Sequence, residues 1–205
     1  MRVSKEKAEE NRGKLLQAAS RLFREKGVDG VGVAEVAKEA GLTHGALYAH
    51  FPSKDALAAA AFSEGFAGNL AAIGAWAAGR QPSFGDYLDA LFSERARDRV
   101  GEGCPMVASA SEASRHGPAM SENFASAFAT EVALIEASLD PALPAAHRRQ
   151  AALATLAAQI GALAVARAVA THDGALSREV LHATRSIIDA GANAAPAQKA
   201  PRKRS

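Results

Sequence analysis

Residues 32–57 read GVAEVAKEAGLTHGALYAHFPSKDAL, and they are the most informative part of the sequence. Apolar residues recur at helical spacing over about Val33–Ala40, which predicts a short helix. Gly41 follows, at the position where a left-handed helix end favours glycine. A second short helix is expected over about Thr43–His50, because Thr43 is a suitable N-cap. Two short helices joined by a glycine turn are typical of a helix-turn-helix, whose second helix can lie in a DNA major groove.

The outer face of the second helix suits DNA better than solvent. Leu47 and Phe51 should hold this helix to the core, while Tyr48 points away. A glycine on that face allows close approach of the backbone, the phenol and imidazoles reach phosphates, and the N-terminal amides favour anions. Ser53 caps the next helix and leaves Lys54 near a phosphate strand. The alternative is a short helical hairpin whose loop merely carries polar side chains. The residues expected at DNA are Thr43, His44, Gly45, Ala46, Tyr48, His50 and Lys54.

The same stretch resembles the TetR family of transcriptional repressors. The family's motif is approximately Thr-x-x-x-Ile-Ala-x-x-Ala-Gly-Val-Ser-x-Gly-Thr-Leu-Tyr-x-His-Phe-x-x-Lys-x-x-Leu, and its spacing is unbroken here. The corresponding positions are Gly32, Val36, Ala37, Ala40, Gly41, Leu42, Thr43, Gly45, Ala46, Leu47, Tyr48, His50, Phe51, Lys54 and Leu57. The resemblance covers about the first 60 residues and is far more specific than a generic helix-turn-helix pattern.

Carried over by position, the resemblance implies groove contacts at His44, Gly45 and Ala46, and phosphate contacts at Tyr48, His50 and Lys54. Three positions depart from the motif. Gly32 and Ala46 replace hydroxyl residues, and Ala34 stands where a polar base reader is common. We therefore expect few direct base contacts, with His44 making much of the base contact and DNA shape supplying the rest.

The distribution of charge also separates the helix-turn-helix region from the rest of the chain. Residues 1–54 carry ten Lys or Arg against seven Asp or Glu, residues 55–193 carry ten against fifteen, and residues 194–205 carry four against none. The acidic excess begins where the DNA-binding unit ends. We expect an all-α chain with three parts: a helix-turn-helix domain over 1–53 with an N-terminal arm over 1–10, a helical ligand-binding and dimerisation domain over 54–193, and a basic disordered tail over 194–205.

Periodicity and caps predict the other helices at about 12–26, 53–78, 83–98, 106–115, a segment ending near 139, 145–171 and 177–190. The helix over about Ala145–Thr171 has no charge between Arg149 and Arg167, so most of its sides should be buried. It is either the central helix of a monomeric bundle or, as the resemblance implies, part of a four-helix dimer interface. A homodimer would suit a palindromic operator.

The resemblance also implies a pocket in the C-terminal domain for a small, largely apolar effector. Each candidate for its lining is otherwise ordinary core, and these candidates are Phe62, Phe66, Tyr87, Phe92, Cys104, Met106, Phe124 and Phe128. Trp76 and Met120 are further apolar candidates. The polar candidates are Glu112, Arg115 and His116.

Cys104 is the only cysteine, so no internal disulfide can form, which is consistent with a reducing cytoplasm. It precedes a proline at the expected start of a helix, where amide dipoles would lower the pKa of the thiol. The two interpretations are a reactive sensor of electrophiles and an inert buried thiol.

Other classes of protein have weaker support. The six histidines show no metal-ligand spacing, and no nucleophile elbow, phosphate loop or Rossmann fingerprint is present, so we expect no enzyme, metal or cofactor. Residues 1–10 lack the apolar region of a signal peptide, and no uninterrupted apolar run approaches the ~18 residues of a membrane span. The expected location is the cytoplasm. The expected partners are double-stranded DNA, a small-molecule effector and a second copy of the chain. The alternatives are a helical interaction module and a thiol-based electrophile sensor acting through Cys104.

Overall fold

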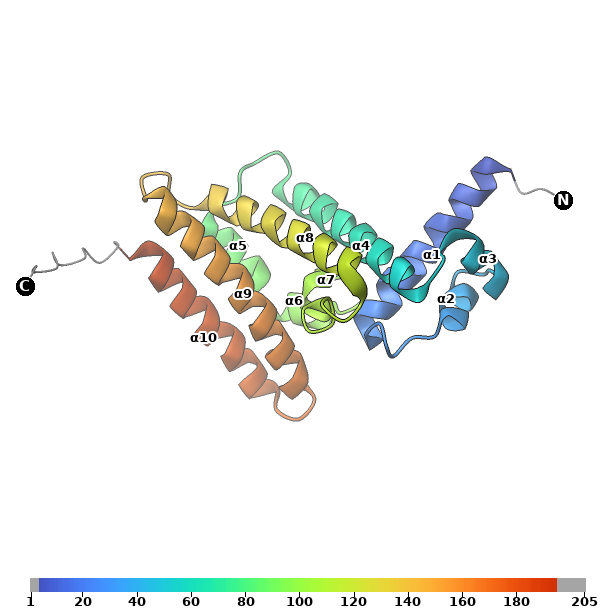
Figure 1. The fold of residues 1–205 in the computed structure, drawn as a ribbon. Coiled ribbons are helices and arrows are strands. Elements are labelled where there is room, and N and C mark those ends of the chain that lie inside the picture. The colour runs from blue at the N-terminus through green and yellow to red at the C-terminus, as the bar shows by residue number, and fades with distance from the viewer. Residues whose placement is uncertain (1–3, 195–205) are drawn as a thin grey trace, which may run out of the picture.

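The computed structural model describes residues 4–194, and every regular element in this range is an α-helix (Figure 1). The helices are α1 (Lys5–Lys26), α2 (Val33–Glu39), α3 (His44–His50), α4 (Lys54–Ala77), α5 (Phe84–Leu91), α6 (Glu94–Asp98), α7 (Pro105–Ser109), α8 (Gly117–Ser138), α9 (Ala145–Ala170) and α10 (Gly174–Asn193). The predicted all-α architecture, with an N-terminal helix-turn-helix followed by a helical bundle, is confirmed.

The first three helices share a small hydrophobic core. Leu15 of α1, Val36 of α2 and Leu47 of α3 are fully buried in it. The start of α4 completes this core, because Leu57 and Ala61 also pack there. Burial of these side chains holds together a unit in which α2 and α3, with seven residues each, are too short to be stable alone.

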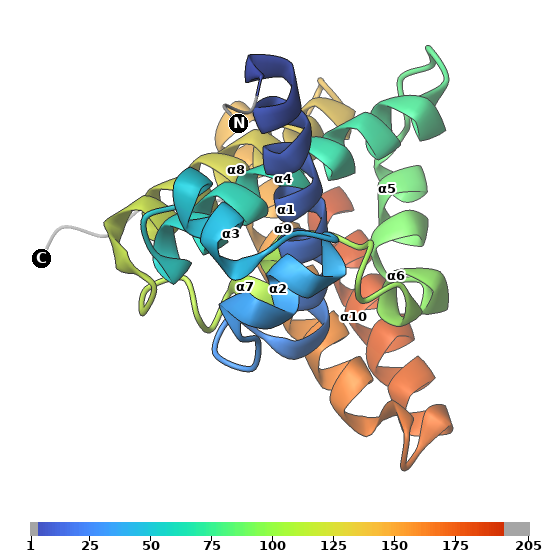
Figure 2. The ribbon, with the colours of Figure 1, turned by 90° about the vertical axis from the view of Figure 1, so that its right-hand side faces the viewer.

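The remaining helices enclose a second core. Met106, Ile135 and Leu156 are fully buried in it, and they come from α7, α8 and α9. α9 and α10 are joined by a short loop and lie side by side at the end of the molecule away from α2 and α3 (Figures 1 and 2). α4 connects the two parts, since Leu57 lies in the first core and Phe62 in the second.

Two helices, α4 and α9, are long and apolar enough to cross a membrane by length and mean hydropathy alone. Both are integral to the bundle: α4 packs against α1 and α8, and α9 packs against α8 and α10. Core helices of bundles commonly combine such length and hydropathy.

Several helix ends differ from the sequence-based expectation. α1 begins at Lys5, capped by the Ser4 side chain, so the described part of the N-terminal arm is a helical extension. The helix expected over about 83–98 is interrupted, because Ser93 caps a separate helix α6 by accepting a hydrogen bond from the Ala96 N–H at 3.0 Å. α7 ends at Ser109 rather than near Arg115. The predicted disordered tail lies almost wholly outside the described residues.

Candidate DNA-binding surface and ligand cavity

The short helix α3 is held in place by its own ends and by two buried side chains. The Thr43 hydroxyl accepts a hydrogen bond from the Ala46 N–H at 3.2 Å, as an N-cap does. Gly41 has a φ of 68°, which glycine adopts without strain, and it lets the chain turn between α2 and α3. Leu47 and Phe51 anchor one face of α3 in the core. The opposite face is therefore fixed in orientation and open to a partner.

That open face carries most of the predicted DNA contacts. Tyr48 is 47% exposed, and its ring lies edge-on to the His44 ring with a centroid distance of 5.0 Å. A Cβ added to Gly45 would meet no protein atom within 4 Å, so packing within the protein does not require a glycine there. The absent side chain instead leaves the backbone open to close approach. His50 is half-buried at the C-terminal end of α3.

Lys54 begins α4 directly after α3. Its position follows from Ser53, whose hydroxyl accepts a hydrogen bond from the Ala56 N–H at 3.0 Å and so starts the helix. The predicted DNA residues thus occupy one continuous segment, Thr43–Lys54, that comprises the cap and body of α3 and the first residue of α4.

A cavity of about 770 Å³ lies in the second part of the molecule, which is large enough for a drug-sized ligand. Its walls come from α4, α5, α6, the segment before α7, α8 and α9. Trp76 and Tyr87 form an aromatic corner with a ring-centroid distance of 5.6 Å. Ile73, Leu91 and Leu163 add apolar surface.

The cavity is only partly where the sequence suggested. Of the eight proposed ligand contacts, Tyr87 and Cys104 line it. The other six pack in or against the second hydrophobic core instead, and these are Phe62, Phe66, Phe92, Met106, Phe124 and Phe128. Large apolar side chains at helical spacing fill the interior where helices meet closely, whereas the cavity forms where they diverge.

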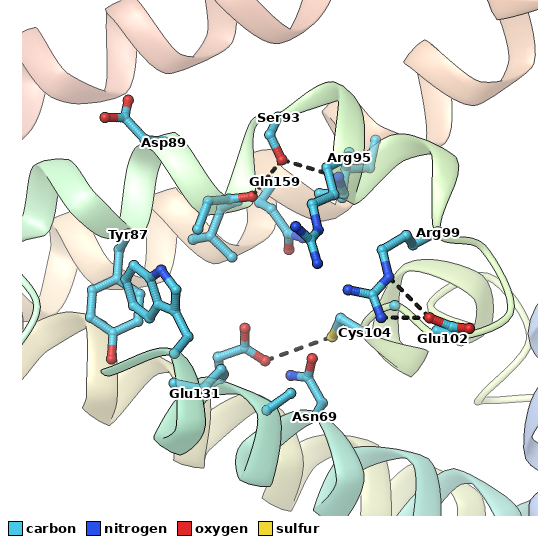
Figure 3. A pocket seen from close by; sticks show the side chains of 18 of the residues that line it. Asn69, Tyr87, Asp89, Ser93, Arg95, Arg99, Glu102, Cys104, Glu131 and Gln159 are labelled. Atoms are coloured by element: carbon cyan, nitrogen blue, oxygen red, sulfur yellow. Dashed lines mark hydrogen bonds and ion pairs between the residues drawn. The ribbon is translucent and has the colours of Figure 1, made fainter. Parts of the chain in front are cut away.

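The surface of the cavity is mainly apolar, as expected, but it includes polar groups that the sequence did not indicate. Sequence reasoning missed a set of polar residues that line it, among them Asn69, Ser93, Arg95, Arg99, Glu102, Glu131 and Gln159 (Figure 3). Arg167 of α9 also lines the cavity. The absence of charge near Gln159 along α9 was a signal that this glutamine is buried, but no local pattern identifies the cavity it faces. Of the polar candidates from the sequence, Glu112 and His116 contact the first part of the molecule rather than the cavity.

A buried carboxyl, Glu131, and a half-buried thiol, Cys104, form a pair on the cavity wall. The Cys104 thiol lies 3.7 Å from Glu131 Oε2 and donates to it. Burial raises the pKa of Glu131 to about 7. Burial and the neighbouring Glu131 carboxyl raise the pKa of Cys104 well above its ordinary value. The expected net lowering of this pKa at a helix N-terminus is wrong: the backbone amides of Met106 and Val107 do lower it, but burial and the Glu131 carboxyl raise it by more.

Polar contacts link the cavity domain to the helix-turn-helix unit and to the start of α4. Arg24 Nη1 of α1 donates to the Gly103 carbonyl at 2.9 Å, and Gly103 lines the cavity. The Val28 N–H donates to Glu112 Oε2 at 3.1 Å. His116 Nδ1 lies 3.1 Å from Asp55 Oδ1 in the first turn of α4. Both ends of the helix-turn-helix unit are therefore tied to the cavity domain.

Comparisons with known proteins give a consistent result. The family model of bacterial regulatory proteins of the tetR family matches residues 15–61. The transcriptional regulator AcrR of Shigella flexneri is 45% identical over 56 residues, which are 27% of this chain and 26% of AcrR. The curated relatives are therefore matched over about a quarter of their length.

Solved structures extend the likeness, in fold, to about nine-tenths of the chain. A TetR-family regulator from Cytophaga hutchinsonii superimposes with a TM-score of 0.69 at 22% identity, covering 92% of this chain and 97% of that one. The regulator FadR from Bacillus subtilis, solved with stearoyl-CoA, has a TM-score of 0.62 at 12% identity, covering 88% and 97%. The N-terminal domain of this protein therefore matches the TetR family of transcriptional regulators in sequence, and about nine-tenths of the chain matches a solved TetR-family regulator in fold.

Proposed function

We propose that this protein is a repressor that binds a palindromic operator as a homodimer and is released by a small molecule in the cavity. The observation that carries the proposal is the family's helix-turn-helix sequence, with its outer face exposed on α3 and its inner face buried. Such a helix can enter a major groove, while Tyr48, His50 and Lys54 contact the flanking phosphates. His44 supplies the main base contact.

The surface of α9 supports the homodimer. Its exposed side is a continuous stripe of small and apolar residues, comprising Leu153, Ala154, Ala157, Gly161, Ala164, Val165 and Ala168. On the neighbouring α10, Leu176 and Ile187 are also exposed, Ile187 by 74%. Exposed apolar surface of this extent marks an interaction site, and a second copy of the same two helices would cover it with a matching surface.

The route from cavity to DNA runs through two connections. α4 carries Lys54 at one end and Trp76 of the cavity wall at the other. The Gly103 carbonyl, also on the wall, accepts the hydrogen bond from Arg24 of α1. A ligand that fits only one arrangement of these walls would favour the corresponding spacing of the two α3 helices. Its effect on DNA affinity equals its preference for that arrangement, typically about 1–3 kcal/mol.

The alternative mechanism, covalent sensing of electrophiles by Cys104, is disfavoured by the raised pKa of this thiol, since the thiolate is the reactive form. Replacing Cys104 with serine tests it. If electrophiles release the Cys104→Ser variant from DNA as they release the native protein, thiol sensing is excluded and reversible induction stands.

Selection of DNA from a random library by the purified full-length chain tests the proposed function. We expect recovery of a palindrome, footprints on two half-sites about one helical turn apart, and a dimeric mass by light scattering. Enrichment of no sequence at moderate salt would contradict the DNA-binding role and leave a helical interaction module as the better interpretation.

A further inference from the structure

The cavity contains two buried polar groups that the protein itself does not satisfy. Gln159 is 2% exposed, and its Oε1 atom has no hydrogen-bond partner among the described residues. Glu131 is also 2% exposed, and among the described residues its carboxyl accepts a hydrogen bond only from the weakly donating Cys104 thiol. Both line the cavity, one from α8 and the other from α9. Buried acceptors without donors are costly, so such groups commonly meet a ligand.

The view into the cavity shows how these groups lie. Glu131 and Gln159 enter it from opposite walls, with Tyr87 on one side and Arg95 and Arg99 on the other (Figure 3). A ligand that donates hydrogen bonds between the two acceptors would therefore place its body against the aromatic corner.

The cationic residues of the wall do not neutralise Glu131. Arg99 pairs with Glu102, with Nε 3.1 Å from the carboxylate oxygen. Arg167 donates to the carbonyls of residues 96 and 97 at 3.0 and 2.8 Å. Arg95 is exposed at the rim.

Glu131 differs in burial and pairing from the other acidic residues that line the cavity. Asp86 pairs with Arg80, Asp89 pairs with Arg185, and both lie towards the surface. Among the residues that line the cavity, Glu131 is the one buried carboxyl.

We propose that the cavity binds an amphipathic amine, whose protonated nitrogen donates to Glu131 and to Gln159 Oε1 while its apolar body packs against Trp76, Tyr87 and Leu163. This inference rests on the proposed function only in treating the cavity as the effector site. The amine supplies N–H donors for both acceptors and a positive charge for the carboxylate. A carboxylate ligand would instead meet Arg95 and Arg99 and leave the buried acceptors unsatisfied.

Binding should then be linked to the ionisation of Glu131. In the free protein burial raises the pKa of this carboxyl to about 7, whereas a bound cation favours its charged form. Simple amines, like lysine, stay protonated up to about pH 10. Affinity for the amine should therefore rise about tenfold from pH 6 to pH 8, following the ionised fraction of Glu131.

Calorimetry on the full-length protein without DNA tests the site with three probes of one shape: 2-(1-naphthyl)ethylamine, 2-(1-naphthyl)ethanol and 1-naphthaleneacetate. At pH 8 we expect the amine to bind at least about tenfold more tightly than the other two. Glu131→Gln should remove that preference and the pH dependence while leaving the affinity for the alcohol within about threefold. Gln159→Met, which keeps the size but removes the acceptor, should weaken amine binding by about threefold to tenfold.

Glu136→Gln is the matched control, because Glu136 lies on the same helix, pairs with Arg149 and does not line the cavity. It should bind all three probes as the native protein does. Any of three results would overturn the proposal. Naphthaleneacetate could bind more tightly than the amine, the Glu131→Gln variant could bind the amine as tightly as the native protein does, or the amine could fail to bind at millimolar concentration. DNA affinity measured separately distinguishes the two claims: an amine that binds but does not change DNA affinity leaves this site intact and contradicts the effector role.

Discussion

Glu131 shows how a carboxyl buried beside a cavity affects the stability of the folded protein. Its carboxyl is buried among apolar groups, and its folded-state pKa is raised from 4.5 to about 7. Between these values the folded protein holds a proton that the unfolded chain releases. The contribution of Glu131 to stability therefore falls as pH rises from about 4.5 to 7 and is constant above.

Replacing Glu131 with glutamine should remove the loss of stability that accompanies the rise in pH. We expect Glu131→Gln to have stability similar to the native protein at pH 5 and to be more stable at pH 8, by a few kcal/mol at most, roughly 3 from the size of the pKa shift. Denaturant unfolding of both proteins at the two pH values measures the difference. A native protein that is relatively more stable at pH 8 than the variant would show that the carboxylate has a stabilising partner.

The residues of the predicted DNA-binding segment, Thr43–Lys54, should separate general affinity from sequence preference. Tyr48→Phe and Lys54→Ala remove phosphate contacts, so each should weaken binding to all DNA sequences about equally, and Lys54→Ala should reduce the salt slope by about one. His44→Ala should change the preferred sequence instead. Fluorescence anisotropy on the selected operator and on base-substituted copies, at several salt concentrations, tests this. If all three variants bind as the native protein does, the assigned DNA surface is wrong.

At the scale of elements, the helix-turn-helix was predictable because its signals are local. Gly41, Thr43 and Ser53 end or cap helices by contacts within a few residues, and Leu47 and Phe51 are buried as their spacing predicted. The break at Ser93 was harder to predict, since a serine within an amphipathic run reads as a surface residue until its capping hydrogen bond is known.

The cavity could not be predicted for a different reason. Its lining comes from several helices, including Trp76, Glu131 and Gln159, which lie far apart in sequence. Periodicity distinguishes buried from exposed faces, but it does not show where two buried faces fail to meet. Phe62 and Met106 were therefore assigned to the ligand when they pack in the core. The uncharged run of α9 was informative but incomplete, because one side of this helix is buried in the chain and the other is open.

The two sides of α9 give a direct test of the dimer. Gly161 is exposed and a Cβ there meets no atom within 4 Å, whereas the adjacent Ala162 is buried in the core. Gly161→Glu should therefore yield a folded monomer with weakened operator binding, and Ala162→Glu should unfold the chain, because it forces an unpaired charge into a packed interior. Circular dichroism and light scattering distinguish the outcomes. A folded Gly161→Glu dimer with native affinity would exclude this face of α9 as the interface.

For the molecule as a whole, exposed apolar side chains gather at the three proposed sites. Among the described residues, the exposed large hydrophobic side chains are Tyr48 on α3, Trp76 at the cavity, and Leu153, Val165, Leu176 and Ile187 on α9 and α10. A scattered set would need no explanation, but this set coincides with the surfaces proposed for DNA, ligand and the partner subunit. The molecule works as a regulator only if these surfaces are coupled.

Arg24 is the contact through which we expect coupling to pass. Its guanidinium is half-buried, donates to the Ser20 carbonyl of its own helix and, across the two parts of the molecule, to the Gly103 carbonyl on the cavity wall. Arg24→Met keeps much of the length and apolar packing but removes both hydrogen bonds. DNA affinity without ligand should change by no more than about threefold, because Arg24 is not part of the α3 surface.

The reduction of DNA affinity by a ligand should change much more in Arg24→Met than the DNA affinity without ligand. If a cavity ligand lowers DNA affinity of the native protein by about tenfold, a coupling of roughly 1.4 kcal/mol, we expect the Arg24→Met variant to show a reduction of about threefold or less. The measurement is a DNA titration with and without 2-(1-naphthyl)ethylamine or an effector found by screening. Lys26→Met is the control, since Lys26 pairs on the surface with Glu35 at 2.6 Å within the helix-turn-helix unit. Full coupling in Arg24→Met, with ligand affinity unchanged, would mean that α4 alone transmits the signal from Trp76 to Lys54.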